Sequence, residues 1–451
     1  MPLPSHLAEQ IRAVKEALRS QDGDVGAAER SLNSPNMLDA VHQTYLQTVA
    51  LACRKMIETA QASKAIDTST AIDIIGFHGQ TCAHKPPSIA RLTGEEPYTI
   101  QMGDGQALAN ALEIPVAFDF RSDDLMNGGE GAPFAPMHHH NLALGTKAQG
   151  VFPIAFLNGG NTGNLSVITH QIGKSELAVL GWDTGPFNHF PDLLARREAY
   201  KPHDTNGEVG LQGTVNRSLL RILFNQSSVT QDGANFLTLS PPRSSDPQWY
   251  RELPEMLGTA PVDGALLSLP DRMRTAEYFA AYVATLSFAF IPEDCEFPPF
   301  IGLCGGGWKN PVVTTHFKHL MRGSPGQIIL EEHEKTYHRL IGRMARKPAT
   351  IESTAAFGFD PSSMEARIFA DAAARRVWGE PFTRPSMTGV SKPTICGRIR
   401  FPYSSDPNGF AVGRYMSEAG ILNEAISKSD FIDPRFGRAI RGWRKGVAPR
   451  L

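Results

Sequence analysis

The sequence predicts an α/β protein with a parallel or mixed sheet and helices on its faces. Strand-like apolar segments alternate with helical patterns from residue 71 onward, the order that builds such sheets. Glycine and polar clusters follow several of these strands, at the sheet edge where open α/β folds bind ligands. At 451 residues the chain is long enough for two domains, each with its own core. We expect domains over residues 1–150 and 151–405, followed by a basic helical tail over residues 406–451.

The composition is that of a folded protein that acts on a small molecule. Hydrophobic residues make up 41% of the chain and charged residues 20%. A net charge of −2 offers no electrostatic footprint for nucleic acid or an anionic membrane, so we expect neither as a partner. No segment is long enough to span a bilayer and the N-terminus lacks the apolar core of a signal peptide, which predicts a cytoplasmic location. The five cysteines are far apart and lack C-x-x-C spacing, so neither disulfides nor a metal site are expected.

Helices are expected before the first strand. Apolar residues recur at helical spacing over residues 5–20, with Ser5 as a possible cap, and again over residues 37–64. The segment between them is polar and is expected to be a loop.

The first strand, Ala71 to Phe77, ends in a His-Gly-Gln-Thr segment. Its polar residues His78, Gln80 and Thr81 would lie at the carboxyl edge of the sheet and are candidate ligand contacts. His78 and His84 also suggest a metal site, but a histidine pair beside a sheet edge is more often hydrogen-bonded structure, which we favour.

A second strand–helix–strand pattern starts at Tyr98 and ends with a strand over residues 115–120. Asp119, Arg121 and Asp123 follow that strand, and Arg121 is expected to form either a structural ion pair or a sugar or phosphate contact. A glycine- and proline-rich segment, residues 127–136, is expected to be an active-site loop or a domain boundary. The three histidines after it are expected in a solvated turn, because consecutive residues do not all face one ion.

The most informative segment is a predicted hairpin over residues 155–168. Its turn carries three glycines and three asparagines: Gly159, Gly160, Gly163, Asn158, Asn161 and Asn164. Both residue types tolerate positive φ, so the tip can turn backbone N–H groups outward as an anion cradle, with phosphate as the expected guest. The alternative is an ordinary hairpin turn.

An aspartate follows this hairpin at the end of the next strand. Asp183 leads into a Thr-Gly-Pro corner containing Gly185 and then into a helical pattern. A carboxylate there can accept a proton from an attacking hydroxyl or water, or hold magnesium, and phosphoryl transfer needs both functions. The alternative is a helix cap.

A third glycine cluster lies further along the chain. After helices over residues 215–224 and 271–288, a strand ends in Gly305, Gly306 and Gly307 and leads into a helix over residues 312–321. Three glycines between strand and helix let a ribose or base lie on the backbone, whereas a tight turn needs only one.

Taken together, these motifs are similar in order to those of the anhydro-N-acetylmuramic acid kinases and their relative levoglucosan kinase. The motifs are HGQT at 78–81, DFRSDD at 119–124, GGEGAPFAP at 128–136, NGGNTGNL at 158–165, DTGPFN at 183–188, CGGGWKN at 304–310, PSSMEARIFA at 361–370 and SMTGV at 386–390. The similarity covers about residues 70–400, and a colinear set is more specific than any single motif.

The resemblance implies a two-lobed fold of the actin and hexokinase (ribonuclease H-like) type that binds ATP and Mg2+. It implies that the 1,6-anhydro bridge of a sugar is hydrolysed while O6 receives the γ-phosphoryl group, with Asp183 as the general base that activates water. The hairpin would hold phosphate, and the glycine turn with Asn310 would hold adenosine. The residues implied to contact the sugar are His78, Gln80, Thr81, Arg121, Asp123, Gly185 and Glu365. Homodimers are also implied.

The sequence departs from the family pattern in three places. The Gly-Thr-Ser hairpin that opens the family has no counterpart before Ala71, so we expect an incomplete first lobe. The turn at 158–165 is more polar than in the family, and Arg243 stands where lysine is usual. Two hypotheses follow: an anhydrosugar kinase whose first hairpin lies outside this sequence, or a non-catalytic relative that keeps the sugar cleft. Asp183 favours the enzyme, since a binder needs no base there.

Overall fold

The structure is a computed structural model that describes residues 3–32, 34, 36–67, 71–225, 235–245 and 261–426. The chain divides into two compact units. The second unit contains residues Ala132–Glu365 and Ser386–Gly389, and the first contains the remaining residues. Both units combine strands and helices, so the predicted α/β class is confirmed.

A five-stranded sheet forms the centre of the second unit. Its strands lie in the order β7-β6-β5-β8-β9. Their bounds are β5 Ile154–Gly159, β6 Thr162–His170, β7 Leu177–Pro186, β8 Phe300–Cys304 and β9 Thr350–Ser353. β6 is antiparallel to both β5 and β7, and the other four strands all run in the same direction. This order and these directions are those of a ribonuclease H-like lobe.

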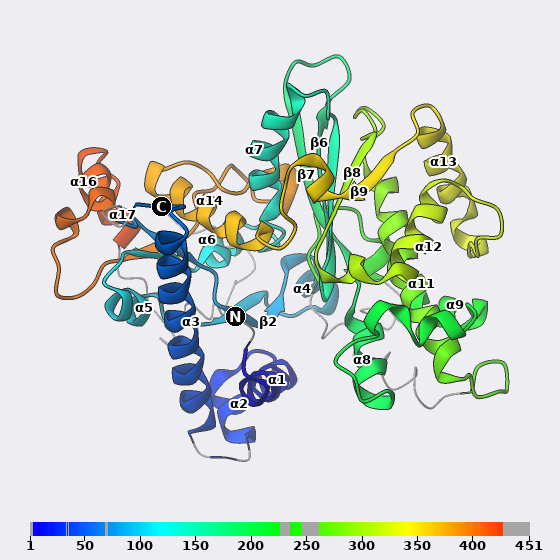
Figure 1. The fold of residues 1–451 in the computed structure, drawn as a ribbon, viewed down its shortest axis with the longest axis horizontal. Helices are drawn as coiled ribbons and strands as arrows, with labels where there is room; N and C mark the ends of the chain where they lie inside the picture. Colours follow the sequence, from blue (N-terminus) through cyan, green and yellow to red (C-terminus); the bar gives the residue numbers. More distant parts are fainter. Residues whose placement is uncertain are drawn as a thin grey trace. The chain divides into compact units, whose positions relative to one another are not determined.

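Helices cover both faces of this sheet, with α7 on one side and α11 and α12 on the other (Figure 1). The helices are α7 Ala135–Lys147, α8 His189–Glu198, α9 Arg217–Asn225, α11 Leu269–Ser287, α12 Pro311–Met321 and α13 Glu334–Ala345. Every residue of α11 from Thr275 to Ser287 is buried, which makes it the central helix of this unit. Short 3-10 turns connect them, including η1 Thr205–Gly207, η2 Gly210–Gln212 and η6 Gly306–Lys309.

The first unit contains a smaller sheet. Its strands β1 Ile75–Phe77, β4 Val116–Phe118 and β10 Arg398–Arg400 lie in the order β1-β4-β10. β1 and β4 are parallel, and β10 is antiparallel to β4. Among the described residues β1 pairs with β4 only, so it forms one edge of this sheet.

An antiparallel pair, β2 Gln80–Lys85 and β3 Tyr98–Met102, packs on the N-terminal helices. The apolar stripe of α1, with Leu7, Ile11 and Val14, enters the same core as Ile100 of β3. The helices of this unit are α1 Ser5–Ser20, α2 Val25–Ser31, α3 Met37–Ala62, α4 Pro87–Thr93, α5 Gly105–Leu112, α6 Phe120–Met126, α14 Met364–Trp378, α16 Ala411–Glu418 and α17 Leu422–Ile426. α15, Pro385–Thr388, lies at the return to the second unit.

Several sequence-based predictions of local structure were wrong. α2 lies in a segment expected to be a loop, and it begins because the Asp24 carboxylate accepts the N–H of Ala27. The cap of α1 is Pro4, not Ser5. The three histidines expected in a turn lie on α7, where His139 stacks on Phe156 at a ring distance of 4.2 Å.

The division into units also differs from the boundaries expected at residues 150 and 405. Residues from Ala366 to Pro385 and from Val390 onward group with the first unit. The physical reason is that β10 completes the sheet beside β4, and α14 packs so closely on Gly76 that any Cβ atom there would overlap with the Phe369 carbonyl. Trp249 and residues 427–451 of the expected tail lie outside the described residues. None of the described helices is long and apolar enough to cross a membrane.

Candidate active site

Three corners of the second unit meet at one end of its sheet. The hairpin tip between β5 and β6 accepts two backbone hydrogen bonds from the corner that follows β7: Phe187 N–H to Asn161 O and Asn188 N–H to Gly160 O, both 3.0 Å. Gly305, after β8, lies against the Asn158 side chain and the backbone of Gly159. The hairpin, the Asp-Thr-Gly-Pro corner and the glycine cluster, far apart in sequence, therefore form one site.

The glycines of the hairpin are required by close packing and not by unusual φ. Gly159, Gly160 and Gly163 all lie outside the left-handed region, in contrast to the expected tip geometry. A Cβ atom at Gly159 would lie 2.6 Å from the Phe187 ring and 2.8 Å from Trp308 Nε1, and one at Gly163 would overlap with the Thr184 hydroxyl. The bare tip is therefore what allows the three corners to approach one another.

Asp183 lies on β7 directly opposite Asn164 of the hairpin, next to a β-bulge. Cross-strand neighbours project to the same face of a sheet, so the carboxylate and Asn164 share a face. Asp183 is 5% exposed, and its Oδ2 accepts the N–H of Ser245 at 2.8 Å and the hydroxyl of Ser244 at 3.2 Å. These two donors fix the orientation of one oxygen of the carboxylate.

Arg243 holds that segment in place. It is 1% exposed, its Nε donates to the Asp183 carbonyl at 2.9 Å, and the Arg243 carbonyl accepts the Asp183 N–H at 3.1 Å. The guanidinium also donates to the carbonyls of Phe236, Leu237 and Leu239 and to the Ser287 hydroxyl. It lies over the rings of Phe236 and Phe290, with centroid distances of 5.1 and 4.7 Å. Arg243 therefore ties the segment before Ser244 to the strand that carries Asp183.

In the glycine cluster after β8, the local structure requires glycine at two positions but not at the third. Gly305 has a φ of +91°, and a Cβ atom at Gly307 would overlap with the Asn188 side chain. Gly306 is exposed, and a Cβ atom there would meet nothing within 4 Å. The backbone of Gly306 is therefore unobstructed, as a ligand on this turn would require.

Asn310 has both side-chain groups engaged within the protein. Its Oδ1 accepts the N–H of Val312 at 2.9 Å as the cap of α12, and its Nδ2 donates to Glu277 Oε1 at 2.6 Å. The structure thus shows Asn310 shaping the turn.

Two histidines of the first unit, His78 and His84, lie near Arg121. His78 stacks on Phe369 with a ring distance of 4.3 Å, and its Nε2 is 3.3 Å from the Thr81 hydroxyl. Burial and the nearby Arg121 lower the pKa of both His78 and His84 well below the usual value, so both imidazoles are neutral. Gln80 follows on β2, where its side chain donates to the Thr81 carbonyl at 3.3 Å.

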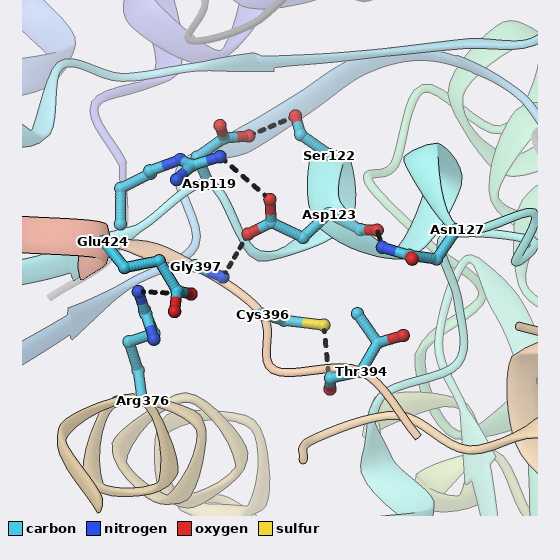
Figure 2. Close-up of polar contacts among 10 residues, drawn as sticks. Asp119, Ser122, Asp123, Asn127, Arg376, Thr394, Cys396, Gly397 and Glu424 are labelled. Carbon is cyan, nitrogen blue, oxygen red and sulfur yellow. Dashed lines mark hydrogen bonds and ion pairs between the residues drawn. The ribbon is translucent and has the colours of Figure 1, made fainter. Parts of the chain in front are cut away.

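Both oxygens of the Asp123 carboxylate are engaged within the first unit. Figure 2 shows its two oxygens directed at the β10 segment, where they accept the N–H of Gly397 at 2.8 Å and the Arg398 guanidinium at 3.1 Å. Both partners of this ion pair are largely buried. Burial, with Asp123 as the second cause, raises the pKa of Asp119 to about 8, and Asp119 accepts a hydrogen bond from Ser122. These acids hold the start of α6, the helix that carries Arg121.

The last two expected contacts lie in the second unit. Gly185 is on β7 with a φ of +135°, two residues after Asp183. Glu365 is exposed in the first turn of α14. Among the residues that the structure describes, no group of three histidine, cysteine, aspartate or glutamate side chains could hold a metal ion.

Comparison with known proteins identifies the family. Residues 32–328 match the family model of anhydro-N-acetylmuramic acid kinase. The chain belongs to the anhydro-N-acetylmuramic acid kinase family. It is therefore a phosphotransferase with an alcohol group as acceptor.

Individual members of the anhydro-N-acetylmuramic acid kinase family match over most of their length. The enzyme of Rhodopseudomonas palustris (strain HaA2) is 32% identical over 335 residues, which is 74% of this chain and 75% of the relative. That of Methylorubrum populi is 29% identical over 389 residues, 86% of this chain and 85% of the relative. A ligand-bound xylulose kinase from Lactobacillus acidophilus aligns at 14% identity with a TM-score of 0.25, over 63% of this chain and 49% of that one, too low a score to bear on the fold.

Sequence reasoning missed two features of this anhydro-N-acetylmuramic acid kinase family member. Ser244 and Ser245 hold the Asp183 carboxylate, but a Ser-Ser pair in a proline-rich segment carries no signal of such a contact. Glu277 was not singled out because it lies within a helical pattern. A glutamate among the buried residues of a helix does, however, indicate a carboxyl group with a specific partner.

Proposed function

We propose that this protein is an ATP-dependent kinase that hydrolyses the 1,6-anhydro bridge of 1,6-anhydro-N-acetylmuramic acid and phosphorylates O6. The observation that supports this proposal most strongly is the position of Asp183, buried beside the glycine hairpin with one oxygen fixed by Ser244 and Ser245. A fixed, nearly dry carboxylate beside a cradle for phosphate is what a base in phosphoryl transfer requires.

In the proposed reaction, Asp183 accepts a proton from water as the water oxygen bonds to the anomeric carbon. The bond from that carbon to O6 breaks, and O6 forms a new bond to the γ-phosphorus. ATP supplies the phosphoryl group and ADP leaves. When bound, Mg2+ would neutralise phosphate charge, and such sites typically use few protein ligands. The hairpin residues Gly159, Gly160, Asn161, Gly163 and Asn164 would orient phosphate through backbone and amide groups.

The adenosine would lie on the turn formed by Gly305, Gly306 and Gly307, where the exposed face of Gly306 supports contact with a flat ligand. The sugar contacts that we propose in the first unit are His78, Gln80, Thr81 and Arg121. Those that we propose in the second unit are Gly185 and Glu365. Neutral histidines and an arginine match a substrate with hydroxyl groups and a carboxylate, which supports a muramic acid derivative over levoglucosan. Asp123 would act indirectly, by holding α6 in place.

The test is the Asp183→Asn variant, because the amide keeps the shape of the side chain but does not accept the proton. We expect phosphoryl transfer to 1,6-anhydro-N-acetylmuramic acid to fall by about 10³-fold or more, while Mg-ADP binding measured by calorimetry changes by less than about threefold. Asp192→Asn, on the adjoining helix α8, is the matched control and should retain activity.

Wild-type activity is measured on levoglucosan in parallel, since the two sugars differ in the lactyl carboxylate. Equal turnover of both sugars would contradict the proposed substrate. Unchanged turnover in Asp183→Asn would remove the assigned base, and a lack of Mg-ADP binding by the wild type would contradict the kinase reaction itself.

A further inference from the structure

Glu277 is a buried carboxyl group that the mechanism above does not use. It lies in the middle of α11 with no solvent exposure, and its Oε1 accepts a hydrogen bond of 2.6 Å from Asn310 Nδ2. Its Oε2 has no hydrogen-bond donor among the described residues. An ionised oxygen buried without a donor costs free energy, whereas a protonated carboxyl group makes this oxygen a donor itself.

A suitable acceptor lies next to it. Asp204 is 4% exposed, and its carboxylate accepts the N–H groups of Val209 at 3.0 Å and Gly210 at 2.9 Å. Gly210 also lies so close to Glu277 that a Cβ atom there would overlap with Oε2. The two carboxyl groups therefore meet at Gly210, where one shared proton removes their repulsion. Burial raises the pKa of Glu277 to about 8, and the charge of Asp204 contributes to this increase.

We propose that Glu277 is a positioning residue for the glycine turn of the nucleotide site, and that it carries the proton that links Asp204 to Asn310. Asn310 ends η6 and caps α12, so its orientation determines where the turn meets the helix. Gly207, in the segment after Asp204, packs on the same Asn310 oxygen. The inference rests on the proposed function, in which this turn holds adenosine.

Ionisation of Glu277 should therefore displace the turn. A second negative charge next to Asp204 would separate the two carboxylates, and Asn310 would move with Glu277. Arg274, on the same helix, acts in the opposite direction and lowers the pKa of Glu277. Adjoining elements carry further ionisable groups. Burial lowers the pKa of His316 on α12 to about 4 and raises that of Asp192 on α8 to about 6, while Glu198 pairs with Arg272 and Glu208 with Lys201.

The experiment compares the wild type with Glu277→Gln across pH. Glutamine accepts from Asn310 through its oxygen and donates to Asp204 through its nitrogen, so it mimics the protonated acid and does not ionise. Mg-ADP affinity is measured by calorimetry from pH 7.5 to 9. We expect the wild type to lose about tenfold in affinity and Glu277→Gln to change by less than twofold. Glu208→Gln, an exposed neighbour, is the matched control and should follow the wild type.

Two results would overturn the inference: an equal decline in Glu277→Gln, or no decline in the wild type. Urea unfolding without nucleotide provides a second measurement, in which the wild type should lose stability more steeply than Glu277→Gln between pH 6.5 and 8. If the wild type binds no Mg-ADP at any pH, the proposed function fails, and so does the positioning role of Glu277. The unfolding profiles still test separately whether Glu277 is protonated in the folded protein. Should Glu277→Gln not fold, Asp204→Asn should move the decline in affinity to lower pH, and an unshifted midpoint would count against the proposal.

Discussion

Asp183 depends on residues that lie 60 positions further along the chain. Its carboxylate is held by Ser244 and Ser245, and its backbone exchanges two hydrogen bonds with Arg243. The guanidinium is fully buried, so each of its contacts replaces water that the group has lost. The position of Asp183, the proposed base, is therefore set by the buried cation Arg243, which is not among the proposed substrate contacts.

The first prediction concerns Arg243→Lys. Lysine supplies three donors from one nitrogen and lacks the planar fork that reaches three carbonyls, the Asp183 carbonyl and Ser287 at once. Buried carbonyls left without donors should lower the free energy of unfolding by about 2–3 kcal/mol. Turnover should fall by about tenfold or more because Asp183 loses its fixed orientation.

Urea unfolding and steady-state kinetics check both effects, with Arg217→Lys, at an exposed position of α9, as the control. An unfolding midpoint equal to that of the wild type would show that the Arg243 contacts are not needed, although lysine is usual at this position in the resembling family.

Three adjacent glycines between β8 and α12 have different structural roles. Gly305 needs a positive φ, Gly307 packs against the β7–α8 corner, and Gly306 faces open space. A strand that ends in a bare turn and is followed by a capped helix places backbone N–H groups where a ligand can reach them. Of the three adjacent glycines, only the middle one is exposed.

Substitution by alanine should separate these roles. Gly306→Ala should leave the free energy of unfolding within about 0.5 kcal/mol of the wild type but weaken Mg-ADP binding, because the methyl group occupies the ligand side of the turn. Gly307→Ala should cost about 1–3 kcal/mol of stability because its methyl group meets the Asn188 side chain and the Phe187 ring. Thermal unfolding and calorimetry measure the two effects, and normal Mg-ADP affinity in Gly306→Ala would place the nucleotide elsewhere.

Across the whole molecule, buried carboxyl groups make stability depend on pH. Burial raises the pKa of Asp119 and Glu277 to about 8 and that of Glu130 to about 7, well above their values in an unfolded chain. The folded protein then holds protons that the unfolded chain has lost, so this stability is complete below about pH 4 and decreases as pH rises toward 8. Buried His78, His84 and His139, whose pKa values are lowered, act below pH 6.5, where stability decreases as pH falls.

Among the described groups, the raised carboxyl pKa values have the larger effect between pH 6.5 and 8, which gives a defined prediction. The free energy of unfolding should decrease as pH rises through this interval, by up to about 1.4 kcal/mol per pH unit for each carboxyl group that still holds its proton. Urea unfolding at several pH values measures the slope, and Asp119→Asn should reduce it. A stability that is constant or rises over this interval would mean that these acids are ionised in the folded protein.

Local patterns were reliable where one periodicity acted over many residues. The helix over residues 5–20, the hairpin over residues 155–168 and the strand before Gly305 all appear where predicted. They were unreliable where a short element depends on a distant partner. β10 is only three residues long and exists because β4 offers it an edge, so nothing in its own sequence indicates a strand.

The sequence by itself determined the α/β class, the family and the three glycine-bearing motifs of the proposed site, because turns and strand ends depend on residues adjacent in the chain. Only the tertiary structure decided which side chains remain available to a ligand. In the structure, Asp123 accepts a hydrogen bond from Arg398 of β10, and Asn310 donates one to Glu277. Asp183 is oriented by the segment that contains Arg243. The physical reason is that hydrogen bonds between buried groups are set by through-space proximity, which spacing along the chain does not encode.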